Sequence, residues 1–544
     1  MATRKSRSET AKQESEVAEV VSGGEDLGGM SFNSLMSAAT SAVSAQALAR
    51  ESVKLYTEWL KIMWGKSERE IPQKDWRFAD PAWKDNPLYT RLAKGYLAFC
   101  DSVDKVVEDN PDWKKRERAK FLTGILTSAM SPTNTLLGNP AALKKAYETG
   151  GMSLVRGTQN MVGDMVAGKR LPSQVKASDF KVGENLAATP GAVVFRNEVL
   201  EVIQYTPVTA KVREIPTIIM VPPIGKYYFM DLAPGRSFVQ HAVSKGIQTF
   251  ITSWRNPQKE HADWGLDEYV QSLLDTVGAA CEVTGSKKVN ILGLCAGGIL
   301  STLLLNYMAA TGDKRINAAA FGVMLLDFES EAPIGALQVK PVLRLAAKRS
   351  AKKGILPASS LATVFAWMRP NDLVWNYWVN NYLEGKEPPT FDILAWSVDG
   401  TNLPGTLHGQ FLDIFENNPL PNAGALTVLG QPVDLSRIKV ETLVTGALTD
   451  HLTPWKACYR TTQLLGGKST FVLSNAGHIA ALVPGGDPEQ WLAKAQKHTG
   501  TWWEVWAEWT LERSGKDKPV PGTLGSAHHP IVDKAPGQYV HQPA

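Results

Sequence analysis

Hydrophobic residues change their spacing near residue 171, and this change divides the chain into two parts. Before it, apolar residues recur at helical spacing. One such helix face is formed by Tyr56, Trp59, Leu60 and Met63. After it, short β-branched runs alternate with helix-like stretches. We therefore expect a mostly helical N-terminal domain over residues 30–170 and an α/β domain over residues 171–544.

Six apolar runs in the second part have the length and composition of strands, and a turn signal follows each run. They cover residues 217–221, 248–252, 289–292, 319–325, 442–445 and 470–473. Buried strands joined by helices are typical of a mainly parallel sheet that helices cover on both faces. The predicted fold class is therefore α/β.

The alternation lapses between about residues 328 and 437, which predicts an insertion placed to form a cap or lid. Its aromatic residues are Trp367, Trp375, Tyr377, Trp378, Tyr382 and Trp396. They are equally suited to the core of a helical subdomain, and the two interpretations are compatible. Residues 1–29 are rich in Ser, Glu, Gly and Lys and lack aromatic residues, so we expect a disordered tail there.

Charge and cysteine content exclude several classes of protein. A net charge of +4, without a basic block, argues against nucleic-acid binding. The four cysteines are scattered without a CxxC pair, so neither a disulfide framework nor a metal site is indicated. No signal peptide and no run of about 18 apolar residues is visible, which predicts a protein kept in the cytoplasm without a membrane span. The face around Trp59 then either packs on the protein or helps to hold it at a hydrophobic surface.

The strongest local signal is the sequence Gly-Leu-Cys-Ala-Gly at residues 293–297. It lies between a predicted strand and a predicted helix, which is the context of a nucleophile elbow. The helix N-terminus after Cys295 favours a thiolate, and the N–H group of Ala296 is placed to stabilise an oxyanion. The alternative is a buried cysteine in a glycine-rich turn.

An elbow nucleophile needs an acid and a histidine, which follow it in that order in this architecture. Asp450 comes after the run 442–445, and His478 comes after the run 470–473. We expect both in loops that follow strands. His451 is the nearest rival to His478, but it adjoins the proposed acid and is expected to lie at the surface or behind the site.

A second oxyanion donor is expected from the loop after an earlier strand. The sequence Pro-Pro-Ile-Gly-Lys-Tyr-Tyr at residues 222–228 occupies that position, and the N–H group of Ile224 or Gly225 is the candidate donor. The alternative is a proline-rich turn without a catalytic part.

Taken together, these motifs resemble the polyhydroxyalkanoate synthases. The loop at 222–228 is similar to that family's PP-x-x-x-K-Y-Y loop, and residues 253–257 match its SWRNP segment. Further similar segments are Arg77–Trp83 with Asn86-Pro87, Ser131–Asn134 with Asn139-Pro140, Asp399–Pro404, Gly477–Ile479, and Trp502-Trp503 with Trp506. The residues Leu407–Gly409 and Ala535–His541 look closer to the medium-chain class, whereas Ala476 and Ala480 depart from the expected pattern, which leaves the preferred acyl length open.

The resemblance implies an α/β-hydrolase fold and polymerisation of (R)-3-hydroxyacyl-CoA into a polyester with release of CoA. Cys295 would hold the acyl chain as a thioester and His478 would deprotonate it. Asp450 would orient His478 or help to activate the 3-hydroxyl group that attacks next. Contacts to the substrate are expected from Lys226, Tyr227, Trp254, Arg255 and Asn256. The family also implies a homodimer, located in the cytoplasm at polyester granules.

Two other functions remain open from the residues alone. A hydrolase of esters or thioesters on the same fold would give free hydroxy acid and no polymer. A non-enzymatic granule-coating protein would use the helical region, and the Cys-Asp-His order would then be accidental. No bound cofactor or metal is predicted, since the chain has no P-loop, dinucleotide or HExxH motif and CoA is the leaving group of the substrate.

Overall fold

The computed structural model describes residues 44–329, 338–450, 452–475, 478–482 and 488–544. The predicted tail over residues 1–29 lies outside them. The chain forms two compact units. A helical unit contains the residues up to Leu171 with Lys340–Ala346 and Thr363–Gly385, and an α/β unit contains Pro172–Val339, Ala347–Ala362 and Lys386–Ala544. The domain boundaries expected from the sequence stay a prediction.

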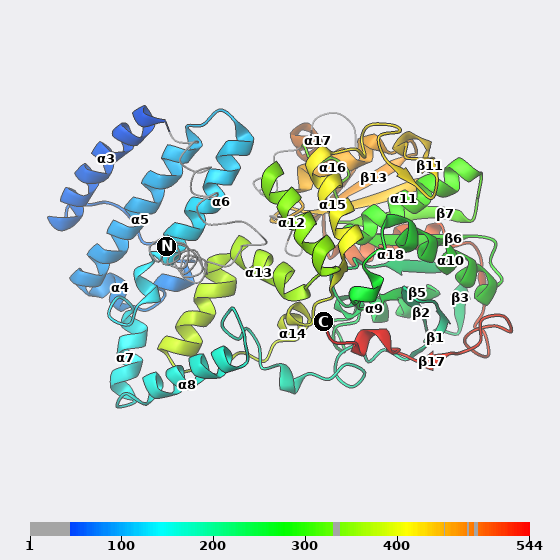
Figure 1. Cartoon of the computed structure of the whole chain (residues 1–544), viewed down its shortest axis with the longest axis horizontal. Helices are drawn as coiled ribbons and strands as arrows, with labels where there is room; N and C mark the ends of the chain where they lie inside the picture. Colours follow the sequence, from blue (N-terminus) through cyan, green and yellow to red (C-terminus); the bar gives the residue numbers. More distant parts are fainter. Residues whose placement is uncertain (1–43, 330–337, 451, 476–477, 483–487) are drawn as a thin grey trace, which may run out of the picture. The chain divides into compact units, whose positions relative to one another are not determined.

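The N-terminal part of the helical unit is built from a series of α-helices (Figure 1). These are α3 (Ala45–Met63), α4 (Ala82–Asp85), α5 (Pro87–Glu108), α6 (Trp113–Ala129), α7 (Pro140–Glu148) and α8 (Met152–Val166). Two Asn-Pro pairs start helices: the side chains of Asn86 and Asn139 accept hydrogen bonds from backbone N–H groups of α5 and α7. Proline at the first helical position needs no hydrogen-bond acceptor there, so the pair defines the start of each helix.

The apolar face of α3 is largely exposed in the helical unit. The exposed fractions are 66% for Tyr56, 51% for Trp59, 43% for Leu60 and 65% for Met63. The side of α3 that is buried carries Ala47, Glu51 and Ile62 instead. The Trp59 indole donates to the Gly95 carbonyl of α5 (3.4 Å), but most of this face is uncovered by the described residues of the unit, and its packing on the protein stays a prediction.

Most aromatic residues of the insertion belong to the helical unit. Edge-to-face contacts join Trp367, Trp375, Trp378 and Tyr382 in series. The Trp378 indole donates to the carbonyl of Asn134 (3.0 Å). These contacts are those of a helical core. Trp396, by contrast, lies in the α/β unit, and the role of the insertion as a lid stays a prediction.

The α/β unit is organised around an 11-stranded sheet with the order β15-β14-β13-β12-β7-β6-β4-β5-β2-β1-β17. Its strands are β1 (Gly191–Arg196), β2 (Leu200–Tyr205), β4 (Thr217–Met220), β5 (Thr249–Trp254), β6 (Val289–Leu294), β7 (Ile316–Gly322), β12 (Glu441–Ala447), β13 (Ser469–Asn475), β14 (His478–Leu482), β15 (Gln496–Thr499) and β17 (Asp533–Lys534). Neighbouring strands from β5 to β13 in this order are parallel, and they are the six strands predicted from the sequence. The other five strands pair antiparallel.

Six helices pack on this sheet, and some of them also pack against one another. They are α9 (Phe238–Ser244), α10 (Leu266–Thr284), α11 (Ala296–Thr311), α16 (Trp455–Leu464), α17 (Pro488–Lys494) and α18 (Trp502–Glu512). Helix α10 packs against α11, and Phe238 of α9 stacks on Trp502 of α18. Helix α11 is apolar almost all round and its residues from Gly297 to Asn306 are buried, as is expected of a helix in the middle of a core.

The remaining elements are short or belong to the insertion. They are α12 (Lys340–Lys353), α13 (Ala358–Met368), α14 (Asp392–Val398), α15 (Gly405–Asn417) and the two-stranded pairs of β3 (Lys211–Arg213) with β16 (Asp517–Pro519), β8 (Ile355–Leu356) with β9 (Leu403–Pro404), and β10 (Thr427–Val428) with β11 (Gln431–Pro432).

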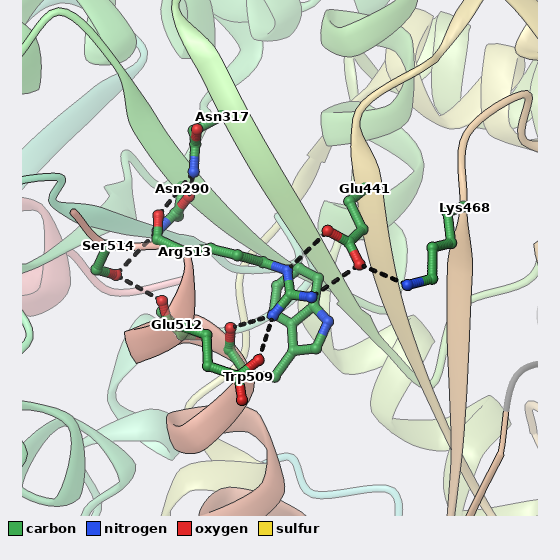
Figure 2. A network of polar contacts seen from close by, with 9 residues as sticks. Asn290, Asn317, Glu441, Lys468, Trp509, Glu512, Arg513 and Ser514 are labelled. Atoms are coloured by element: carbon green, nitrogen blue, oxygen red, sulfur yellow. Dashed lines mark hydrogen bonds and ion pairs between the residues drawn. The ribbon is translucent and has the colours of Figure 1, made fainter.

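A polar network fixes the amino-terminal ends of the central strands to the end of α18 (Figure 2). Arg513 donates to both carboxylate oxygens of Glu441 at the start of β12 (2.7 and 3.0 Å) and lies over the Trp509 ring. Its carbonyl oxygen accepts from the side chains of Asn290 and Asn317 on β6 and β7. This network lies at the edge opposite the carboxyl ends of the strands, where open α/β sheets place their sites.

Candidate active site

Cys295 forms the turn between β6 and α11 at the carboxyl edge of the sheet. Its backbone has φ 50° and ψ −127°, a conformation that L-residues rarely adopt. Its N–H donates to the carbonyl of Gly322 at the end of β7 (3.0 Å), and its carbonyl accepts from Gly298 in α11 (2.9 Å). The strand, turn and helix predicted from the sequence are therefore present, and Cys295 as a whole residue is of intermediate exposure.

The glycines beside Cys295 allow the close approach that this turn requires. A Cβ atom on Gly297 would lie 2.5 Å from the carbonyl oxygens of Met220 and Val221. A Cβ atom on Gly293 would lie 2.9 Å from the Cα atom of Gly298. The helix can therefore start against the end of β4 only because these positions lack side chains.

Burial raises the pKa of the Cys295 thiol, and the charge of Asp450 raises it further, whereas a hydrogen bond from the N–H of Ala296 lowers it. The balance is a pKa above the ordinary value of a cysteine. The resting thiol is therefore neutral near pH 7, and a base is needed to form the nucleophilic thiolate.

Asp450 lies in the loop after β12, as predicted. Its Oδ1 accepts from the N–H groups of Leu452 (2.8 Å) and Thr453 (3.0 Å), and its Oδ2 accepts from the Thr453 hydroxyl (2.8 Å). The carboxylate is thus held in one orientation, and it is close enough to affect the titration of Cys295. Its role in catalysis stays a prediction.

His478 is the first residue of β14, and its backbone pairs with Asn475 of β13. The prediction that it lies in a loop is wrong, because His478 already belongs to β14, which pairs antiparallel with β13. The position is nevertheless at the carboxyl end of β13, next to β12 and its Asp450 loop. The rival His451 lies outside the described residues, and the role of His478 as base stays a prediction.

The loop after β4 lies against the elbow, since Val221 and the first turn of α11 are in contact at Gly297. The Val221 carbonyl accepts from the Trp254 indole (2.8 Å). Further along, Gly225 forms a backbone bridge with Gly400, and the Lys226 carbonyl accepts from the Trp396 indole (2.8 Å). The loop that carries the predicted oxyanion donors Ile224 and Gly225 therefore begins against the first turn of α11, at Val221, and is held at several points.

The residues predicted to contact substrate all have neighbours within the protein. Trp254 is buried on Tyr269, with ring centroids 4.9 Å apart. Arg255 lies over the Tyr539 ring (4.8 Å) and donates to the carbonyl of Glu198 (3.1 Å).

Lys226, Tyr227 and Asn256 are buried as well. Burial lowers the pKa of Lys226 and raises that of Tyr227. These contacts are structural, and binding of substrate by any of the five residues stays a prediction.

Several neighbours of these residues were not assigned a role from the sequence. The Tyr228 hydroxyl donates to Asp399 (2.8 Å), and burial raises the pKa of that carboxyl group. Lys226 donates to the carbonyl of Gln542 (2.6 Å). Burial raises the pKa of the Cys458 thiol on α16 to about 12, and its Sγ donates to the Thr453 carbonyl (3.4 Å). The segment of Asp399 is recognisable in the sequence and Gln542 directly follows the recognised segment 535–541, but the contacts of these two residues are visible only in the fold.

Within the described residues, no group of three or more His, Cys, Asp and Glu side chains is arranged to hold a metal ion. Among the described helices, none combines the length and the apolar character that crossing a membrane requires.

Comparison with known proteins identifies two family models and several relatives. The N-terminal model of poly-beta-hydroxybutyrate polymerase (PhaC) matches residues 74–242, and the alpha/beta hydrolase fold model matches residues 217–484. The predicted fold class is thereby confirmed. Poly(3-hydroxyalkanoate) polymerases 1 and 2 of Ectopseudomonas oleovorans are 43% and 42% identical to this chain, over 89% and 88% of it and 89% of each relative. The polymerase subunit PhaC of Cupriavidus necator is 38% identical over 89% of this chain and 85% of its own length.

Proposed function

The chain belongs to the poly(3-hydroxyalkanoate) polymerase family, and from this membership we propose that it joins (R)-3-hydroxyacyl groups from CoA thioesters into a polyester while Cys295 carries the growing chain. It is an acyltransferase with polymerase activity. The observation that supports the role of Cys295 most strongly is its strained turn between β6 and the N-terminus of α11, at the carboxyl edge of the sheet.

The first step is transfer of the acyl group to Cys295. His478 takes the thiol proton, and the thiolate attacks the thioester carbonyl. The N–H of Ala296 and that of Ile224 or Gly225 stabilise the oxyanion. When the tetrahedral intermediate collapses, the carbon–sulfur bond to CoA breaks, and the CoA thiolate leaves with the proton from His478. Exchange of one thioester for another keeps the acyl group activated.

The second step is attack by the 3-hydroxyl of another hydroxyacyl group on the Cys295 thioester. His478 accepts the hydroxyl proton, an ester bond forms, and the thiolate of Cys295 is released, so that the lengthened chain is now a CoA thioester. The Cys295 thiolate then takes the chain back by a second thioester exchange, and the CoA thiolate leaves with the proton held by His478. Asp450 acts in this cycle either by orienting His478 or by helping to activate the hydroxyl. Its fixed carboxylate, with the Leu452 and Thr453 donors, suits both roles.

The apolar product leads us to propose that the protein works at the surface of polyester granules in the cytoplasm, as a homodimer. The exposed apolar face of α3 supports the granule location, since a face with Tyr56, Trp59 and Met63 in water favours an apolar surface. Fluorescence microscopy of tagged protein in polymer-forming cells tests the location. Analytical ultracentrifugation tests the dimer.

The decisive assay compares the wild type, Cys295→Ala and Cys281→Ala with short-chain and medium-chain (R)-3-hydroxyacyl-CoA. Cys281 lies in α10 and is also partly buried, so its replacement controls for loss of a thiol. We expect CoA release with polymer in the wild type and in Cys281→Ala, and neither in Cys295→Ala. Release of CoA with only free hydroxy acid would identify a hydrolase instead. The ratio of the two substrates' rates measures the preferred acyl length.

A further inference from the structure

We propose that Gln542 is a positioning residue for the polymerase reaction: its two oxygens hold Lys226 and Asn256, and thereby fix the loop that offers oxyanion donors beside Cys295. This inference rests on the proposed function, since it is the acyl transfer at Cys295 that gives the loop a catalytic task. Gln542 lies in the segment 533–543, which is red in Figure 1.

The segment before Gln542 is anchored firmly to the sheet. Strand β17 pairs with β1, so the segment adds an edge strand. The fully buried carboxylate of Glu201 accepts from the N–H groups of Gln538 and Tyr539 (both 3.0 Å). The Tyr539 hydroxyl donates to the Asn197 carbonyl (2.6 Å). Buried hydrogen bonds, among them those to the Glu201 carboxylate, fix the position of the chain directly before Gln542.

From that anchor, Gln542 reaches two motifs at once. Its carbonyl oxygen accepts from the Lys226 ammonium (2.6 Å), and its Oε1 accepts from the N–H of Asn256 (3.0 Å). The neighbouring carbonyl of Pro543 accepts from the Asn256 side chain. Lys226 is 3% exposed and Asn256 is 1% exposed. Buried donors need acceptors, so both depend on this segment for hydrogen bonds.

The contacts of Lys226 and Asn256 bear on the loop after β4, whose first residue, Val221, lies against Gly297 in the first turn of α11. The Asn256 side chain accepts from the N–H of Asn402 (2.9 Å), two residues after the Gly400 that bridges Gly225. The loop after β4 is thus held at one end by the Trp254 indole on Val221 and at the other by Gln542 on Lys226. The candidate oxyanion donors lie between these two attachments.

The test compares Gln542→Ala, Gln542→Glu, a variant lacking residues 542–544, and the control Gln538→Ala. Gln542→Ala removes the acceptor for Asn256, Gln542→Glu keeps an acceptor oxygen there, and the shortened variant removes the acceptor for Lys226 too. Gln538 is exposed, and its side chain donates to Asp533 of the same segment (2.9 Å). Two readouts are measured on the wild type and on each variant: steady-state CoA release and hydrogen exchange of peptides covering 222–226 and 254–257.

We expect Gln542→Ala to lower kcat about 10- to 100-fold with KM within about threefold, because a misplaced donor is felt in the transition state. The kcat of the shortened variant should fall further. The kcat of Gln542→Glu should lie within a few fold of the wild-type value, and that of Gln538→Ala should equal the wild-type value. Hydrogen exchange in both peptides should be faster in Gln542→Ala than in the wild type, and it should be unchanged in Gln538→Ala. An unchanged kcat, with or without faster exchange, would overturn the positioning role. Because exchange does not depend on the reaction, and the proposed function is tested by Cys295→Ala, the two failures are distinguishable.

Discussion

A methyl group at position 297 should disable the elbow without touching any reacting atom. The Cβ atom of Gly297→Ala would lie 2.5 Å from the Met220 and Val221 carbonyl oxygens and from the Val221 carbonyl carbon. Real Cβ atoms do not approach backbone that closely, and backbone cannot rotate away as a side chain can. Either the start of α11 or the end of β4 must therefore move. Overpacking of this kind costs typically about 1–3 kcal/mol of stability.

The same movement should displace the N–H of Ala296 relative to the loop after β4. A shift of about 1 Å at a reacting group can reduce a rate about 100-fold. We therefore expect a 10- to 100-fold fall in kcat for CoA release. Urea unfolding followed by circular dichroism measures the stability, and a colorimetric thiol assay measures kcat on the folded protein.

Gly278→Ala is the matched control, because Gly278 lies within α10 and a Cβ there meets only the end of the Arg315 side chain at an ordinary 3.5 Å. Alanine in a helix interior is favoured over glycine by about 1 kcal/mol, so this variant should be as stable as the wild type or more so, with unchanged kcat. A folded Gly297→Ala protein with the kcat of the wild type would refute the reasoning about the elbow.

Three further predictions follow from the titration and packing of single residues. Because the pKa of the Cys295 thiol is raised, iodoacetamide should alkylate Cys295 slowly at pH 7 in His478→Ala, and the rate should rise about tenfold per pH unit up to pH 9. Mass spectrometry measures the alkylation rate, and a rate independent of pH would contradict this prediction. Burial lowers the pKa of His408 to about 4, so the unfolded chain binds a proton at a higher pH than the folded chain does. The free energy of unfolding should therefore fall by up to about 3 kcal/mol as the pH drops from about 6.5 to 4. In His408→Asn the unfolding midpoint should depend less on pH. Arg513→Ala should lower stability by about 1.5–3 kcal/mol through loss of the Glu441 contacts, yet leave kcat unchanged, since the network lies at the amino-terminal edge of the sheet (Figure 2); a large loss of kcat in folded protein would show that this edge is coupled to the site.

The six parallel strands could be predicted because each is buried on both faces, and such strands read as short apolar runs. The hairpin of β1 and β2 was not predicted from the sequence. A usable signal is present, because β-branched residues at 193–194 and 202–203 lie on either side of Asn197. Strand β14 was missed as well, because an apolar run as short as Ile479–Leu482 does not distinguish strand from helix.

The position of Cys295 could be predicted because an elbow depends on residues that are adjacent in sequence. The contacts of Lys226 could not, since Gln542 is 316 residues further along the chain. A buried ammonium group indicates that an acceptor must exist, but not which segment supplies it. The same limit applies to Tyr228 and Asp399, whose motifs are recognisable in the sequence while their hydrogen bond is visible only in the fold.

The central claim is that Cys295 carries the acyl chain, and mass spectrometry of the acyl-enzyme tests it most directly. Protein mixed briefly with (R)-3-hydroxyacyl-CoA is quenched in acid, digested and examined for peptides heavier by one or more hydroxyacyl groups. We predict the added mass on the peptide of Cys295 alone, with a ladder of masses spaced by one monomer, and no adduct in Cys295→Ala. An adduct on the Cys458 peptide instead, or polymer formed by Cys295→Ala, would contradict the account.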